Sequence, residues 1–218
     1  KKMISLYNIH INLFSCITLH VNMLFYIVGV SLAVFGLCAS QNYTYVDEVN
    51  LSQYTGTWYQ VYSDLVDRTF EGFGSCITAT YSLKEDGNVS VSNRQVSPNG
   101  TVETISGVAY YDDGNTGGEL TVDLEGTPRS APYWIVSLGP VVEEKYAYSI
   151  VSDNKQLSLF VLTRDVDNFF TMYDDDVLGY LDQYGFDNQL NRPIITKQTE
   201  CVYSDDDVGY PYSDDDSS

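Results

Sequence analysis

Short runs of alternating apolar and polar residues, separated by turns, fill the sequence between residues 55 and 163. In one run Ile77, Ala79 and Tyr81 alternate with threonines and a serine, and Asp86-Gly87 follows as a turn. A period of two predicts β-strands with one buried face, and Gly, Asn and Asp between the runs predict hairpin turns. We expect eight antiparallel strands, over residues 57–63, 77–83, 89–93, 102–111, 120–124, 131–138, 146–151 and 157–163. Eight such strands form either a sandwich or a closed barrel, and the alternation does not choose between them.

The pattern changes after Arg164. Between residues 169 and 184 apolar side chains recur at helical spacing, which predicts a helix that ends near Gly185. A short last strand is expected over residues 194–196. Beyond residue 203 the chain is polar and acidic, and we expect residues 204–218 to be a disordered tail. Calcium binding by the aspartates of this tail is the alternative.

The charge balance and the histidines exclude several classes of function. The chain has 11 Lys and Arg against 30 Asp and Glu, a formal net charge of −19, so we expect no nucleic acid as a partner. Both histidines, His10 and His20, precede residue 41. The remainder therefore cannot form a Ser-His-Asp triad, a histidine-ligated haem or a zinc site that contains histidine. We expect no metal and no cofactor there.

An apolar run over residues 24–37, followed by Cys38-Ala39-Ser40, is typical of a signal peptide. We expect residues 1–40 to be the leader of an exported protein, with an uncleaved membrane anchor as the alternative. Cleavage leaves Cys76 and Cys201, an even pair that favours a disulfide in an exported chain. Four Asn-x-Ser/Thr triplets are potential glycosylation sites, at Asn42, Asn50, Asn88 and Asn99.

Two motifs flank the region of expected strands. Gly56-Thr57-Trp58 opens the first strand, and the stretch Phe-Val-Leu-Thr-Arg that ends at Arg164 closes the eighth. In this order, with eight strands and a following helix, the sequence resembles the lipocalin family, whose Gly-x-Trp motif opens the barrel and whose last strand ends in Arg. Residues 79–83 and 130–135 resemble the subgroup that holds apolipoprotein D and the bacterial lipocalins. The stretch 138–146, where the family carries a second motif, departs from its pattern and is longer.

The resemblance covers about residues 46–203 and implies an all-β fold. The expected architecture is an eight-stranded antiparallel up-and-down β-barrel with a C-terminal α-helix packed outside it, in a domain of residues 41–203. Trp58 and Arg164 are expected to form a structural pair at the closed end, next to Gly56. The guanidinium of Arg164 stacks there on the indole of Trp58. The resemblance also implies a Cys76–Cys201 disulfide that ties the second strand to the C-terminal tail. A free, reactive Cys76, such as an isomerase needs, is the alternative.

Alternation assigns the inward side chains of such a barrel. They are mostly apolar or aromatic, as a lipophile pocket requires. The predicted ligand-binding residues are Ile77, Ala79, Tyr81, Val91, Asn93, Ile105, Gly107, Ala109, Leu120, Val122, Trp134, Val136, Tyr146 and Tyr148. None of them carries a charge, and Arg68, Arg129 and Lys155 are expected at the open mouth, where they could meet an anionic head group.

We therefore expect a secreted, monomeric carrier of a small hydrophobic molecule such as a fatty acid, lysolipid, sterol or pigment. The barrel mouth is expected to make transient contact with a membrane or a receptor. Two other functions stay open. One is an enzyme on the same barrel, an isomerase or a de-epoxidase, although the predicted lining lacks paired carboxylates for acid–base chemistry. The other is an extracellular protein that binds cations or a matrix through its acidic tail.

Overall fold

The computed structural model describes residues 43–112, 114–115 and 117–203. The expected leader over residues 1–40, the sequon at Asn42 and the acidic tail over residues 204–218 lie outside the described residues. The described residues belong to one compact unit, which begins at Tyr43.

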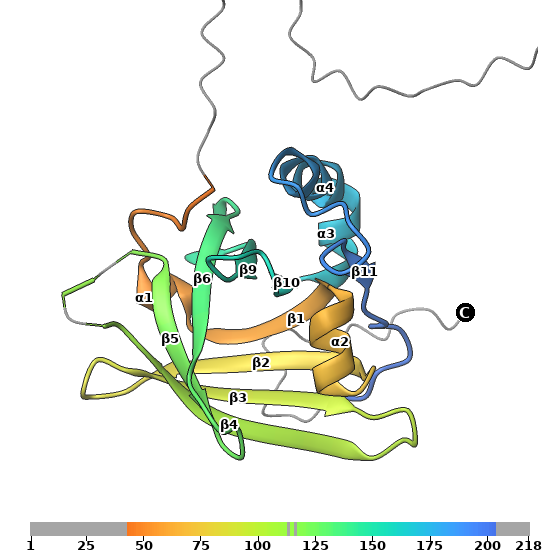
Figure 1. Ribbon diagram of the computed structural model, residues 1–218, viewed down its shortest axis with the longest axis horizontal. Coiled ribbons are helices and arrows are strands. Elements are labelled where there is room, and N and C mark those ends of the chain that lie inside the picture. Colours follow the sequence, from red (N-terminus) through yellow and green to blue (C-terminus); the bar gives the residue numbers. More distant parts are fainter. Residues whose placement is uncertain (1–42, 113, 116, 204–218) are drawn as a thin grey trace, which may run out of the picture. The chain divides into compact units, whose positions relative to one another are not determined.

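Eight strands form a closed antiparallel barrel (Figure 1). Its strands are β1 (Gly56–Ser63), β2 (Ser75–Leu83), β3 (Val89–Val96), β4 (Val102–Tyr110), β5 (Glu119–Leu124), β6 (Ala131–Leu138), β9 (Tyr148–Ser152) and β10 (Leu159–Thr163). Each strand pairs with the next in this order, and β10 pairs with β1, which closes the ring. The barrel is therefore confirmed over the sandwich. A short strand, β11 (Ile194–Ile195), adds to β1 near the C-terminus.

The lengthened stretch before β9 forms a small hairpin of its own. Strand β7 (Val141–Val142) pairs with β8 (Lys145–Tyr146). Glu143 and Glu144 make the turn, with φ values of 48° and 65°. Two successive residues with positive φ are the signature of the type I′ turn that suits a two-residue hairpin loop. This insertion explains why the sequence departs from the family pattern at this point.

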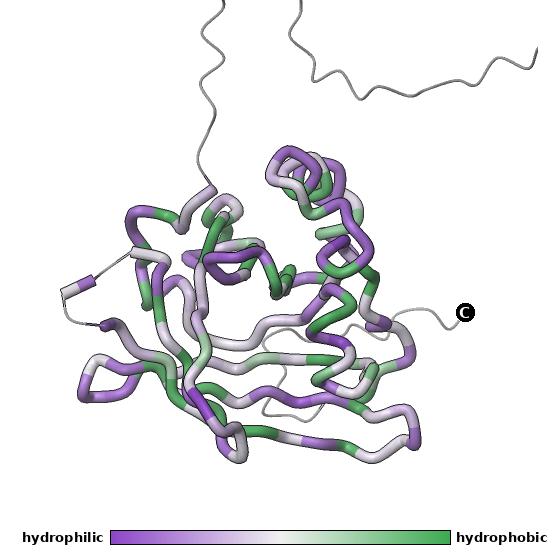
Figure 2. The backbone as a smooth tube through the Cα atoms, in the orientation of Figure 1, coloured by the Kyte–Doolittle hydropathy of each residue, from purple (hydrophilic) through white to green (hydrophobic). Residues whose placement is uncertain are grey.

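Two apolar clusters stabilise the unit, one inside the barrel and one outside it. The inner cluster includes Trp58, Val91 and Leu120. The outer cluster joins β1, β6, β9 and β10 to two helices, α3 (Val166–Met172) and α4 (Asp174–Gln183). Hydrophobic and hydrophilic residues follow one another along the strands and along both helices (Figure 2). Part of the barrel wall is consequently buried on both of its faces.

The expected C-terminal helix is divided in two. Asp165 caps the start of α3 by accepting a hydrogen bond from the Asn168 backbone N–H, and α4 begins directly after Tyr173. Tyr180 on α4 donates a hydrogen bond to the Val136 carbonyl of β6 at 2.9 Å. This bond fixes α4 against the outside of the barrel. None of the helices that the structure describes combines the length and the apolar character needed to cross a bilayer.

Two further short helices were not expected from the sequence. Helix α1 (Leu51–Tyr54) precedes β1, and helix α2 (Leu65–Glu71) lies in the connection between β1 and β2. Asp64 caps α2 by accepting from the Asp67 backbone N–H at 2.8 Å. In an up-and-down barrel the β1–β2, β3–β4, β5–β6 and β9–β10 connections share one end. Helix α2 therefore lies at the open end, and α1 lies at the opposite end.

Candidate ligand-binding cavity

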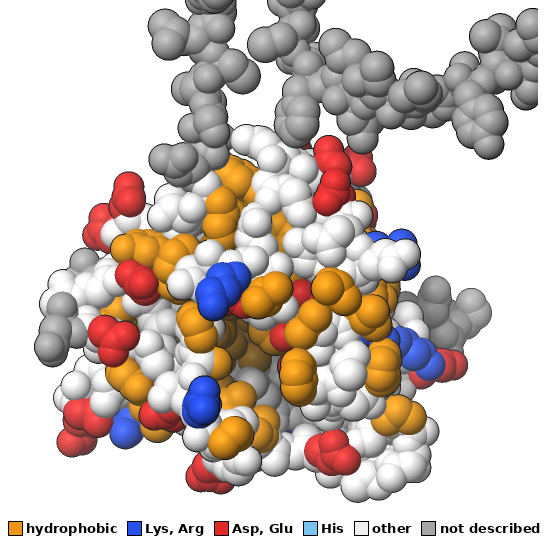
Figure 3. Space-filling model, viewed as in Figure 1, with side chains coloured by type: hydrophobic (Ala, Val, Ile, Leu, Met, Phe, Trp, Pro, Cys, Tyr) orange, Lys and Arg blue, Asp and Glu red, His pale blue; other side chains and the backbone are white. Residues whose placement is uncertain are grey.

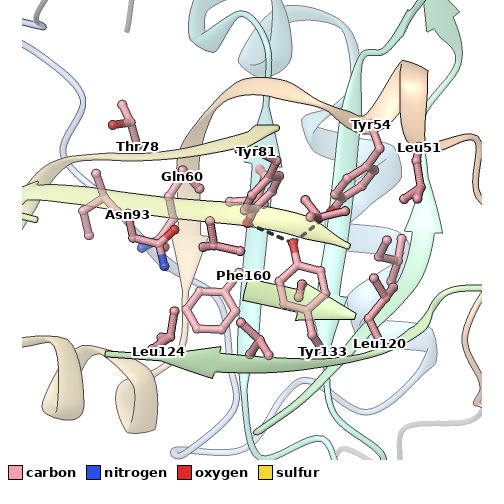
Figure 4. A pocket seen from close by; sticks show the side chains of 18 of the residues that line it. Leu51, Tyr54, Gln60, Thr78, Tyr81, Asn93, Leu120, Leu124, Tyr133 and Phe160 are labelled. Atoms are coloured by element: carbon pink, nitrogen blue, oxygen red, sulfur yellow. Dashed lines mark hydrogen bonds between the residues drawn. The ribbon is translucent and has the colours of Figure 1, made fainter. Parts of the chain in front are cut away.

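The barrel encloses a cavity of about 130 Å³. Figure 3 shows a hollow in the surface beside α2, with hydrophobic side chains at its floor. Figure 4 shows side chains from strands all around the barrel converging on the cavity. Its wall is mainly apolar. Polar groups gather around Tyr133 on one side of the cavity and at Glu71 and Asn93 toward the open end.

Eight of the fourteen predicted residues line this cavity: Ile77, Ala79, Tyr81, Val91, Asn93, Ala109, Leu120 and Val122. They come from β2, β3, β4 and β5, where one strand face is in the barrel and the other faces outward. Alternation works there because each of these strands has a single apolar face.

The assignment of Trp134 and Val136 to the lining is wrong. On β6 the inward residues are Tyr133, which pairs with Leu120, and Ile135, which pairs with Val151. Trp134 and Val136 belong to the outer cluster beneath the helices. Trp134 also packs edge-on against Tyr45, with ring centroids 5.0 Å apart. Both faces of β6 are apolar because helices cover its outside, so alternation could not choose the inward face.

Four other predicted residues lie near the cavity but do not line it. Tyr148 points outward and packs against Phe169 and Tyr173 of the helical layer. Tyr146 lies on the extra hairpin, where its hydroxyl accepts a hydrogen bond from the Asn50 backbone N–H. Ile105 and Gly107 pair with inward residues of β3 yet fall outside the lining. A Cβ at Gly107 would lie 2.2 Å from the Asp123 carbonyl oxygen, so only glycine fits there.

Three tyrosines and a serine form a hydroxyl network at one side of the cavity (Figure 4). The Tyr133 hydroxyl lies 2.8 Å from that of Tyr54 and 3.0 Å from that of Tyr81. The Tyr54 hydroxyl also lies 3.0 Å from the Ser149 hydroxyl. Burial raises the pKa of Tyr54 to about 12 and raises the pKa values of Tyr81 and Tyr133 as well. These hydroxyls are neutral, and they satisfy one another.

Arg164 and Trp58 lie at the closed end of the barrel, opposite to α2, as the resemblance implied. The guanidinium carbon of Arg164 lies 3.5 Å from the centroid of the Trp58 ring. Arg164 donates to the backbone carbonyls of Thr57, Tyr54 and Thr55 at 2.6–3.0 Å. Gly56 is in the left-handed region at φ 102°, and its missing Cβ leaves room for Arg164. Arg164 thereby links the last strand of the barrel to the segment that leads into β1.

The open end contributes a charged residue that the sequence did not suggest. Glu71, the last residue of α2, lines the cavity. Its Oε2 and the Oδ1 of Asn93 are buried and without a hydrogen-bond partner among the described residues. The expectation of an uncharged lining is therefore wrong. Sequence alternation could not reveal Glu71, because a helix within a loop brings it to the cavity.

Two other acids, Asp64 and Asp67, lie close to Glu71 at the open end. Burial raises the pKa of Glu71 to about 7, and the nearby Asp64 adds to the effect. Burial and the charge of Asp64 likewise raise the pKa of Asp67 to about 8. The Asp67 side chain accepts a hydrogen bond from the Leu159 backbone N–H at 2.7 Å, which ties α2 to β10. Arg68 is on the same helix, but its guanidinium donates to the Ile195 carbonyl and lies over the Phe73 ring.

The remaining lining residues were also missed. They are Leu51, Tyr54, Gln60, Thr78, Leu124, Tyr133, Ile135, Phe160 and Leu162, whereas Val89 lines the cavity as the alternation of its strand predicts. For Leu124 the signal was present, since it continues the alternation of β5, whereas β10 is apolar on both faces and its pattern does not single out Phe160 and Leu162. Tyr54 comes from α1, a helix of four residues with no helical periodicity to detect.

Cys76 and Cys201 form a disulfide, with their Cα atoms 5.5 Å apart, which confirms the expected pairing and excludes a free Cys76 thiol. Of the sequons, Asn50 and Asn99 are exposed and Asn88 is half-buried, and their glycosylation stays a prediction. Within residues 43–203, positions 113 and 116 apart, no three carboxylate or thiol side chains are grouped so as to hold a metal ion.

Comparisons with known proteins agree with this architecture. A family model described as a lipocalin-like domain matches residues 49–190. Apolipoprotein D of Cavia porcellus is 37% identical over 103 residues, which cover 47% of this chain and 52% of that protein. The outer membrane lipoprotein Blc of Vibrio cholerae is 35% identical over 120 residues, which cover 55% and 67% of the two chains. The chain thus spans about half the length of the apolipoprotein D relatives that it matches.

Solved structures show the same fold at lower sequence identity. Lobster apocrustacyanin A1 superposes with a TM-score of 0.50 and 18% identity, over 68% of this chain and 79% of that one. The match of the family model to most of the described residues, together with the two motifs and the closed barrel, identifies the family. The chain belongs to the lipocalins, in the subgroup that holds apolipoprotein D and the bacterial Blc proteins.

Proposed function

We propose that this protein binds and carries a small hydrophobic molecule in its barrel and does not transform it. The observation that carries this proposal is the cavity inside the barrel, whose wall consists mainly of aliphatic and aromatic side chains. Removal of apolar ligand surface from water gains about 25 cal/mol per Å². Such a wall binds its ligand without any covalent chemistry.

The size of the cavity limits what fits without rearrangement. An apolar cavity of about 150 Å³ holds one benzene molecule, and this one measures about 130 Å³. A single ring or a short chain therefore fits as the structure stands. A sterol, pigment or long fatty acid exceeds this volume, so it would extend through the open end or displace side chains there.

Export is part of the proposal. The Cys76–Cys201 disulfide supports it, because structural disulfides persist in oxidising compartments such as the extracellular space or the periplasm. The expected contact of the mouth with a membrane or receptor stays a prediction. Phe70 on α2 and Phe73 just after it are exposed by 85% and 51% and would supply apolar surface for such a contact.

Filling the cavity tests the carrier function. Val91 is buried on the lining of β3, so Val91→Phe places a ring in the space that the ligand needs. We expect at least about a tenfold loss of affinity for 2-phenylethanol, a neutral one-ring probe. Val108→Phe is the matched control, because Val108 is on the neighbouring strand β4 and does not line the cavity.

Native mass spectrometry of the protein purified from its expression host provides the second arm, since a carrier retains a stoichiometric small molecule. Melting curves of both variants must show that they fold. Equal affinities of Val91→Phe and Val108→Phe, with no molecule retained by the parent protein, would refute the carrier function.

A further inference from the structure

Three residues of the cavity lining, Glu71, Asn93 and Thr78, carry a buried side-chain oxygen without a hydrogen-bond partner among the described residues, and the first two are tied to the open end. Glu71 Oε2 and Asn93 Oδ1 are both buried, both belong to lining residues, and neither has a hydrogen-bond partner among the described residues. The Gln95 side chain donates to the Glu71 backbone carbonyl at 2.6 Å, and Gln95 follows Asn93 by two residues on β3. This bond holds the end of α2 beside Asn93, so the two oxygen atoms are offered to the same space.

Unsatisfied buried acceptors are costly, and a ligand that donates hydrogen bonds removes the cost. A carboxylate-bearing ligand cannot do so when it is ionised, because it only accepts. Its charge would also face Asp64, the acid at the open end that acts on Glu71. An ammonium group supplies three donors and the opposite charge. The open end therefore favours a cationic head group and disfavours the anionic one expected from the sequence.

The remainder of the cavity specifies the rest of the ligand. Its volume of about 130 Å³ matches one aromatic ring, so a short spacer and the head group would extend from the ring toward the open end. Val91, Leu124 and Phe160 provide apolar wall in the cavity, and Figure 4 shows Leu124 on the side of Asn93, away from the tyrosine hydroxyls, and Phe160 beside those hydroxyls. On this basis, which rests on the proposed carrier function, we propose that the cavity selects a small arylalkyl amine, with its ring among these side chains and its ammonium on the Glu71 carboxylate and the Asn93 amide.

Binding of such a ligand is coupled to a proton. Burial and Asp64 raise the pKa of Glu71 to about 7, whereas Arg68 opposes them. Asp67 on the same helix and Tyr81 on β2 are the other titratable groups electrostatically coupled to Glu71. The ammonium favours the ionised carboxylate, so a protonated Glu71 releases its proton to solvent when the charged amine binds. Near pH 6.5 the intact protein should release a substantial fraction of one proton per amine bound.

Three probes with the same ring and the same two-carbon spacer separate head-group charge from size. They are 2-phenylethylamine, 2-phenylethanol and 3-phenylpropanoate, titrated by calorimetry at pH 7.5. We expect the amine to bind at least about tenfold more tightly than the alcohol, and the carboxylate to bind most weakly. Repeating the amine titration at pH 6.5 in two buffers of different ionisation enthalpy measures the released proton without any substitution.

Glu71→Gln keeps the size of the side chain and removes its charge. We expect this variant to bind the alcohol as the parent does, to lose the preference for the amine and to release no proton. Glu125→Gln is the matched control, since Glu125 is an exposed acid of the β5–β6 connection at the same end of the barrel. It should retain both the preference and the proton release.

The outcomes separate this inference from the carrier function. If the alcohol binds and the amine binds no better, or if no proton is released, the amine preference is refuted while the carrier function stands. If none of the three probes binds, the amine inference is refuted, and the cavity-filling experiment decides the carrier function. Retention of the full amine preference in Glu71→Gln would overturn the role of Glu71, provided that melting shows the variant folded.

Discussion

The guanidinium of Arg164 lies on the face of Trp58, with 3.5 Å between its carbon and the ring centroid, and donates to backbone carbonyls of the segment that leads into β1. The indole N–H of Trp58 donates to the Tyr54 carbonyl at 2.8 Å. Arg164, which directly follows β10, thereby fastens the start of β1 and α1. The pair acts on the closure of the barrel and not on the ligand.

Arg164→Ala should lower the melting temperature by about 5–10 °C, because it removes the stacked cation and leaves several carbonyls without their charged donor. Calorimetric melting measures this, with Arg129→Ala as the control at an exposed position. The affinity for 2-phenylethanol should be unchanged below the melting transition. A large loss of affinity with unchanged melting would place Arg164 on the ligand instead.

Removal of one tyrosine hydroxyl should show how the network is satisfied. Tyr133→Phe deprives Tyr81 of its partner, whereas Tyr81→Phe leaves Tyr133 bonded to Tyr54. We expect Tyr133→Phe to cost about 1–3 kcal/mol and Tyr81→Phe clearly less. Denaturant unfolding of the two variants measures the difference, and the reverse order of cost would contradict the network.

Trp134→Phe should leave ligand affinity and the ligand-induced fluorescence change unaltered, because Trp134 packs against Tyr45 and the helical layer outside the barrel. A fluorescence titration of the variant with 2-phenylethanol tests this. Loss of a saturable signal in the variant would mean that Trp134 faces the ligand, as its sequence pattern suggested.

Asp67→Asn should stabilise the protein at pH 8 and flatten its dependence on pH. Burial and Asp64 raise the pKa of Asp67 from 3.8 to about 8, so the folded protein holds a proton that the unfolded chain has released. Stability therefore falls as the pH rises from about 4 to 8. Asparagine can still accept from the Leu159 N–H, and the gain at pH 8 should be on the order of 1 kcal/mol.

Unfolding by urea at pH 5 and pH 8 measures this effect, with Asp123→Asn as the control at an exposed carboxylate. The control should keep the slope of the parent protein. Equal slopes for the parent and Asp67→Asn would show that the protonation of Asp67 is not linked to folding.

Reduction of Cys76–Cys201 should lower the free energy of unfolding by up to about 5 kcal/mol in the chain-entropy model, since the bond spans 125 residues. Denaturation with and without reductant measures the loss, and a Cys76→Ser/Cys201→Ser double variant should match the reduced protein. Peptide mapping that finds both thiols free in native material would contradict the pairing.

The sequence predicted the barrel well and its lining unevenly, for two physical reasons. On β2 to β5 the outward face is polar, so alternation identifies Ala79, Val91 and Leu120 correctly. On β6 the helices bury the outward face too, and Trp134 looks as suitable for the interior as Tyr133. Glu71 lay beyond any strand pattern, because only tertiary structure brings α2 to the cavity.

The double burial of β6, β9 and β10 divides the barrel into two halves with different freedom to change. A substitution on β9 or β10 disturbs two packed layers at once, whereas one on β3 or β4 disturbs a single layer. Attempts to engineer a new ligand specificity should therefore begin at Val89, Val91, Asn93 and Ala109. Substitutions there change the cavity wall without disturbing the packing of the helices on the barrel. For directed evolution, this half of the barrel is the adaptable one.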